Sequence, residues 1–129
     1  MLLLKTTLCL AAAAVLINFW LSMRIGKLRT TLKISVGDGG NEQVMRRMRA
    51  QANFVENVPL SLILFAAIEA AGKGGMWLAP LGAVYMIGRI CHAIGMDGNF
   101  SAGRPIGMIT TMVPNLALVV VAVLTALGH

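Results

Sequence analysis

The chain has 129 residues, of which 57% are hydrophobic and only 12% charged, and its mean hydropathy is +0.79. Soluble domains contain about 25% charged residues, so this composition argues against a soluble globular fold and favours a compact protein that crosses a membrane several times. The net charge is +6, and most of the excess lies within residues 24–49, beside an apolar stretch. That placement favours membrane lipids with anionic headgroups, or an anionic ligand, and no nucleic acid as partner.

Four apolar segments follow one another along the chain, at about 2–23, 54–72, 76–96 and 106–127. Each is close to the ~20 residues that a helix needs to cross ~30 Å of hydrocarbon, and none alternates as barrel strands do. Polar residues before the second segment and Pro105 before the fourth extend the expected helices, which become about 2–23, 44–72, 76–96 and 105–127. The sequence therefore predicts an all-α membrane protein, a bundle of four transmembrane helices in a single domain over 1–129.

The first segment has features of a secretory signal peptide, with Lys5 before an apolar core and alanines near its middle. More positive charge follows it than precedes it, however, and this basic flank within 24–33 is typical of a retained span. Lysine and arginine counts in the short loops place the first and third connections in the cytoplasm, because the other side carries only Lys5 and Lys73. We therefore expect a multi-pass protein with both termini outside.

The sequence offers little for a metal, a disulfide or a phosphate loop. Cys9 and Cys91 lie inside apolar segments, with no CxxC pair and no Cys/His cluster nearby. The glycine-rich stretch 35–42 lacks the Lys-Ser/Thr that a phosphate-binding loop requires. Its glycines permit positive φ, so we interpret it as a tight turn leading into the second helix.

A polar stripe enters the second apolar segment. Arg46, Arg49, Asn53 and Glu56 are spaced three, four and three residues apart, so they share one face of a helix. An acidic side chain that faces hydrocarbon alone costs roughly 2.5–3.5 kcal/mol. Such groups therefore usually face a partner or a wet cavity, and by default they indicate a functional site.

Further polar groups are expected at the same cytoplasmic end of the bundle. Tyr85, Arg89 and His92 share a face of the third helix, Arg104 begins the fourth, and Arg24 ends the first segment. Two structural alternatives remain open: Arg49, Glu56 and Arg89 could form a buried ion pair between helices, and His92 could be a packing histidine. Glu69 and Asp97 are expected to be solvated charges near the outer and inner ends.

The predicted pocket is positive, because its arginines outnumber its single carboxylate. It suits a small zwitterionic ligand with several carboxylates and one amine that Glu56 can accept. A thiolate is a further candidate anion. A free thiol has a pKa near 8.5, and lowering this pKa by ~1.5 units, toward neutral pH, needs ~2 kcal/mol of stabilisation. Arg104 at a helix amino terminus can supply its own charge together with the helix dipole, which is worth ~0.3–1 kcal/mol.

These motifs resemble the MAPEG superfamily (membrane-associated proteins in eicosanoid and glutathione metabolism), in its small bacterial, microsomal glutathione transferase-like branch. RAQANFVENVP, residues 49–59, resembles the family signature R-A-H-x-N-x-x-E-x-x-P of the second helix, and GDGG and GRICHAIG look like bacterial-branch features. The resemblance implies a homotrimer of four-helix subunits in the bacterial inner membrane. It also implies glutathione, as co-substrate, held between neighbouring subunits near the cytoplasmic face.

Carried over by position, the resemblance implies that the glutathione-binding residues are Arg24, Arg49, Asn53, Glu56 and His92, with Arg89 as a supporting charge. Arg104 would be the catalytic residue that faces the sulfur. The implied activity is that of a transferase or peroxidase, in which the glutathione thiolate attacks hydrophobic electrophiles or lipid hydroperoxides.

The chain departs from the family pattern at three positions. Gln51 stands where histidine is usual, Met96 where some members have a tyrosine, and Pro105 where some have a serine beside the thiolate. These departures keep open a non-catalytic scaffold that binds glutathione or lipid on the same fold. A small multidrug transporter is a third reading, although a proton-coupled carboxylate is not expected among so many arginines.

Overall fold

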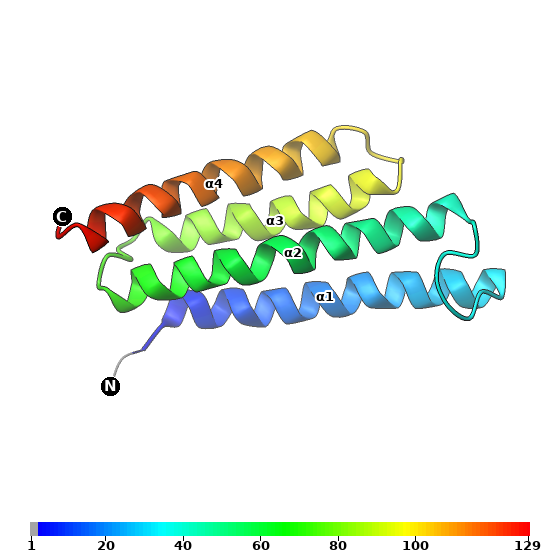
Figure 1. Ribbon diagram of the computed structural model, residues 1–129, viewed down its shortest axis with the longest axis horizontal. Coiled ribbons are helices and arrows are strands. Elements are labelled where there is room, and N and C mark those ends of the chain that lie inside the picture. Colours follow the sequence, from blue (N-terminus) through cyan, green and yellow to red (C-terminus); the bar gives the residue numbers. More distant parts are fainter. Residues whose placement is uncertain (1–2) are drawn as a thin grey trace.

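The computed structural model describes residues 3–129, and in that part every regular element is a helix. Four helices run up and down in an antiparallel bundle: α1 (Lys5–Leu32), α2 (Glu42–Ala70), α3 (Leu78–Met96) and α4 (Gly103–Ala126) (Figure 1). Each is long and apolar enough to cross a membrane. The predicted all-helical class, with four helices apolar enough to span a membrane, is thereby confirmed.

The first helix is longer than the expected range of 2–23, because it continues through its basic flank to Leu32. This flank contains no proline, and the hydroxyl of Thr30 donates back to the carbonyl of Gly26 at 2.9 Å, within the helix. The helix ends only where Lys33 adopts a left-handed conformation with φ of 58°. Hydropathy marks where a helix leaves the apolar layer, but not where its backbone hydrogen bonding stops.

The glycine-rich stretch 35–42 is a tight turn, as expected. Gly37, Gly39 and Gly40 have φ of 71°, 57° and 73°, values that side chains disfavour. The amide of Gly40 donates to Asp38 Oδ1 at 2.8 Å. Asn41 then caps α2, since its Oδ1 accepts from the amide of Val44 at 3.1 Å. The turn thus brings α2 back antiparallel to α1.

The bundle has a narrow core and an apolar outer surface. Within the described residues no contact joins α1 to α4, and α3 is the most enclosed helix. Tyr85 of α3 is fully buried and packs edge-on against Phe65 of α2, with ring centroids 6.3 Å apart. Large apolar side chains also point outward on every helix, among them Leu16, Ile63 and Ile109. Such an exterior is the arrangement expected of helices surrounded by lipid.

Glycines let α3 and α4 approach closely, and these two helices form the most extensive pair. A Cβ on Gly95 would lie 2.7 Å from the carbonyl carbon of Gly103, and a Cβ on Gly107 would lie 2.8 Å from the carbonyl oxygen of Gly88. Gly103 and Gly107 have the small-xxx-small spacing of tightly packed membrane helices. The first turns of α4 are therefore held against the last turns of α3.

Glu69 is not solvated as expected, because its carboxylate caps the amino terminus of α1. Leu4 provides no side-chain cap there. The amides of Thr6 and Thr7 each donate to Glu69 at 2.8 Å, and the Thr7 hydroxyl donates at 2.9 Å. A carboxylate that accepts helix N-terminal amides also interacts favourably with the helix dipole. Glu69 thus ties the end of α2 to the start of α1.

Replacing Glu69 with alanine is expected to lower the free energy of unfolding by about 0.5–2 kcal/mol, the usual cost of losing a helix cap. The matched control is Glu42→Ala in the same helix, because the Glu42 side chain is 70% exposed and, within residues 3–129, pairs only with Arg46. The control should change stability by less than about 0.5 kcal/mol. Thermal unfolding in detergent compares the two variants, and equal midpoints would contradict the capping role.

Candidate functional site

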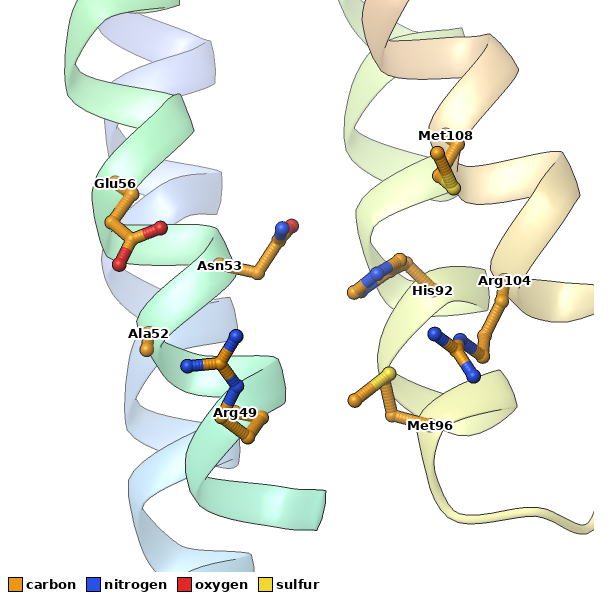
Figure 2. Close-up of a pocket in the computed structure, with 8 residues that line it drawn as sticks. All are labelled: Arg49, Ala52, Asn53, Glu56, His92, Met96, Arg104 and Met108. Atoms are coloured by element: carbon orange, nitrogen blue, oxygen red, sulfur yellow. The ribbon is translucent and has the colours of Figure 1, made fainter. Parts of the chain in front are cut away.

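A cleft of about 210 Å³ opens between α2 and the α3–α4 pair. It lies at the end of the bundle that carries the first and third connections (Figure 1). Figure 2 shows its two walls: α2 on one side contributes Arg49, Ala52, Asn53 and Glu56, and α3 with α4 on the other contributes His92, Met96, Arg104 and Met108. Polar side chains from three separate helices therefore share one concave site.

The α2 wall follows the helical spacing seen in the sequence. Arg49, Asn53 and Glu56 project from successive turns toward the cleft, with Ala52 between them (Figure 2). The side chains of Arg49 and Glu56 are exposed, and neither forms an ion pair within residues 3–129. The alternative of a buried ion pair among Arg49, Glu56 and Arg89 is therefore wrong for this chain. The free carboxylate and guanidinium remain available to a ligand.

The opposite wall combines a buried histidine with an exposed arginine. His92 is 7% exposed and lines the cleft from α3. Arg104 is the second residue of α4, so its guanidinium lies near the positive end of that helix dipole. The close contact of Gly95 with the backbone of Gly103 and Arg104 sets this position. Two arginines and one glutamate line the cleft, so its formal charge is positive.

Arg89 of α3 does not line the cleft, but it contacts Asn53 of the α2 wall. It is 4% exposed, and its guanidinium donates to Asn53 Oδ1 and to the carbonyl oxygen of Gly107, the latter at 2.9 Å. Its closest polar neighbours are thus an amide and a backbone carbonyl. This placement is consistent with the expectation that Arg89 is a supporting charge beside the residues of the cleft.

Arg24 also lies outside the cleft. Its guanidinium forms an ion pair with Asp97 and stacks over Trp20, 4.7 Å from the ring centroid. Arg47 approaches the same carboxylate at 3.8 Å and donates to the carbonyl oxygen of Arg24 at 2.9 Å. Asp97 is therefore an ion-pair partner rather than the solvated charge expected from sequence. A ligand contact by Arg24 stays a prediction that requires a neighbouring subunit.

The chain matches a known protein family. The model of the MAPEG family matches residues 7–124, nearly the whole chain. The chain belongs to the MAPEG family. This MAPEG protein is 28% identical to the "Inner membrane protein YecN" of Escherichia coli strain K12, over 108 residues that cover 84% of the chain and 81% of the relative. The protein of the same name from Escherichia coli O6:H1 matches equally. No solved structure matches.

Two structural features of this MAPEG protein were not anticipated from sequence. The first is the glycine contact of α3 with α4, which the spacing of Gly103 and Gly107 could have revealed. The second is a buried polar cluster deeper in the bundle, where the Ser61 hydroxyl lies 2.7 Å from Tyr85 Oη and 2.8 Å from Asn115 Oδ1. Ser61 lies four residues beyond Asn57 and eight beyond Asn53. The sequence therefore showed that the polar stripe on α2 extends further than Glu56.

The residues lining the cleft suit an organic anion better than a metal ion. Among residues 3–129 no cluster of three or more histidine, cysteine or acidic side chains is placed to hold a metal. The cleft instead presents guanidinium and amide donors, a carboxylate acceptor and an imidazole. Arginine pairs with carboxylates through two parallel hydrogen bonds, whereas glutamate accepts from ammonium.

Proposed function

We propose that this membrane protein is a glutathione-dependent transferase or peroxidase that acts on hydrophobic electrophiles or lipid hydroperoxides. The observation that carries the proposal is the convergence of five polar side chains from three helices on one positive cleft: Arg49, Asn53, Glu56, His92 and Arg104. Membership of the MAPEG family supports glutathione as the ligand. YecN itself is described only as an inner membrane protein, so the proposed activity rests on the site and the family.

Glutathione has the chemistry that these side chains complement. It carries two carboxylates, one ammonium group and one thiol. Arg49 and the Asn53 amide can bind carboxylates, and Glu56 can accept from the ammonium group. Glu56 has no other ion-pair partner in residues 3–129, so binding would not first break one.

Arg104 is proposed to stabilise the thiolate. A free thiol with pKa near 8.5 is only a few per cent ionised at neutral pH, so a nearby cation raises the fraction of reactive thiolate. The thiolate sulfur then attacks the electrophilic atom, and the leaving group departs with the electron pair of the broken bond. His92 faces the same space and can orient the tripeptide. Met96 and Met108 give the cleft an apolar part that a hydrophobic second substrate can contact.

We further propose a homotrimer in the bacterial inner membrane, with the cleft toward the cytoplasm and both termini outside. The end of the bundle that holds the cleft also carries most lysines and arginines, as the positive-inside rule requires of a cytoplasmic end. In such an assembly a neighbouring subunit could close the open side of the cleft, where Arg49, Glu56 and Arg104 are exposed.

The test is a glutathione titration of the purified protein in detergent, monitored by the ultraviolet absorbance of the thiolate. The proposal expects a saturable thiolate signal at neutral pH and conjugation of a chlorodinitrobenzene-type substrate above the rate of free glutathione. Reduction of a lipid hydroperoxide in the presence of glutathione is measured in parallel. Absence of both the thiolate signal and turnover would refute the enzyme.

A non-catalytic scaffold is the second candidate, and the composition of the cleft favours it at two points. Met96 lines the cleft where a phenol could have donated a hydrogen bond, and Pro105 follows Arg104 with neither a hydroxyl nor a backbone amide hydrogen. This candidate expects glutathione to bind with no turnover above the uncatalysed rate. Transport through Glu56 is disfavoured, because two arginines share its cleft.

A further inference from the structure

Arg89 is a buried cation whose hydrogen-bond partners are all neutral. Its two terminal nitrogens donate to Asn53 Oδ1 and to the Gly107 carbonyl oxygen. Its Nε is fully buried with no partner, the only side-chain atom of this kind in residues 3–129. No ion pair in the same part of the chain includes it. A buried charge without a counter-ion is costly, and within a membrane it indicates a functional role.

The guanidinium also connects the two walls of the cleft. Asn53 belongs to the α2 wall, whereas Gly107 lies on α4 directly before Met108 of the opposite wall. The Thr111 hydroxyl donates to the same Gly107 oxygen at 2.8 Å, which fixes that carbonyl further. A planar guanidinium can make both bonds at once because its donors point in fixed, divergent directions. Arg89 therefore holds the α2 wall at a set distance from α4.

The contact with Arg89 also fixes which way the Asn53 amide faces. Arginine has donors and no acceptor, so the atom of Asn53 that it meets must be the carbonyl oxygen. The amino group of Asn53 is then left to donate elsewhere. Figure 2 shows the Asn53 side chain extending from α2 into the space between the walls, toward His92. A pair of donors is thus presented to the cleft, backed by a positive charge.

We propose that Arg89 is a positioning residue that presents the Asn53 amino group to an anion in the cleft, and that this anion supplies the counter-charge that Arg89 lacks. A carboxylate of glutathione is the anion if the proposed function is correct. The electrostatic part of the proposal does not depend on glutathione, because it concerns the potential that Arg89 creates at position 53.

A thiol introduced at position 53 tests that potential without any ligand. In a Cys9→Ala, Cys91→Ala background, Asn53→Cys is alkylated with iodoacetamide across a pH series, with Arg89 retained or replaced by methionine or lysine. We expect the midpoint pH of alkylation to be about one unit lower with Arg89 than with Arg89→Met, and Arg89→Lys to recover part of the difference. Equal midpoints with arginine and methionine would overturn the proposal.

Should Arg89→Met not fold, Ala52→Cys serves as a comparison that keeps Arg89 in place. Ala52 lines the same cleft but has no hydrogen bond to Arg89. The thiol at position 53 is expected to ionise at a lower pH than the thiol at position 52. Equal midpoints at the two positions would again overturn the electrostatic effect.

A double-mutant cycle then tests whether Arg89 acts through Asn53 on glutathione. Arg89→Lys and Asn53→Ala should each weaken the glutathione Kd, by about tenfold, while the double variant should bind no more weakly than Asn53→Ala alone. Additive losses would show that Arg89 does not act through Asn53. If the native protein does not bind glutathione but the thiol midpoints differ as expected, the proposed function fails and the electrostatic effect of Arg89 at position 53 stands.

Discussion

Replacing Arg104 with alanine is expected to abolish the thiolate signal at neutral pH and to lower kcat for conjugation by about 10²–10³-fold. This is the usual cost of removing a preorganised group that stabilises negative charge in the transition state. Arg104 lies at the second position of α4, where its guanidinium and the helix dipole act on the same region of the cleft. The thiol of bound glutathione would then ionise near its ordinary pKa of about 8.5. Turnover by the variant should therefore rise as the pH approaches that value.

The effect on kcat should exceed the effect on the glutathione Kd, because the other cleft residues proposed to contact the tripeptide remain. Arg104→Lys should recover part of the rate, since it restores a point charge without the planar fork. Arg46→Ala is the matched control: Arg46 lies at the same end of the bundle, but its guanidinium binds Glu42 at 2.8 Å and lies outside the cleft. A kcat for Arg104→Ala within a few-fold of the native protein would remove Arg104 from the mechanism.

Substituting alanine for Gly95 is expected to destabilise the bundle by about 1–3 kcal/mol, the usual cost of overpacking a protein interior, and by more if α4 cannot shift. The added Cβ would meet the backbone of Arg104 and Gly103, the latter at 2.7 Å, and backbone atoms cannot rotate out of the way. Displacement of α4 would also move Arg104, so glutathione affinity should fall together with stability.

Gly26→Ala is the control for this substitution, because it too replaces a helical glycine but meets no atom within 4 Å. Alanine is the better helix former by up to about 1 kcal/mol, so this variant should be as stable as the native protein or slightly more so. Thermal unfolding in detergent and glutathione titration compare the two variants. A Gly95→Ala protein with the native Tm would show that the helices pack less closely than described.

The features that the sequence predicted are those that depend on local composition and on helical periodicity. Four apolar segments of the right length yielded four helices, and the spacing of Arg49, Asn53 and Glu56 placed them on one face of α2. His92 and Arg104 were assigned to the same end by topology alone, and they do line the same cleft. Membership of the MAPEG family was visible in the motif of the second helix.

The features that the sequence did not predict depend on contacts between distant residues. Glu69 caps an amide 63 positions away, and Asp97 pairs with Arg24 across 73 positions. Neither pairing has a local pattern, because each carboxylate could equally have faced water. The depth of Arg89 was also hidden, since periodicity assigns a side chain to a face and cannot say whether another helix covers that face.

The cleft lies where the α1–α2 pair meets the α3–α4 pair, and no helix of one pair contacts a helix of the other as extensively as it contacts its own partner. A change in the relative tilt of the two pairs would therefore alter the cleft between them. Hydrophobic thickness of the bilayer acts on helix tilt, at a modest energetic cost for each ångström of mismatch. Lipid chain length is consequently expected to affect the geometry of the cleft, and reconstitution into thinner and thicker bilayers should change its affinity for the proposed ligand, glutathione, without any change in sequence.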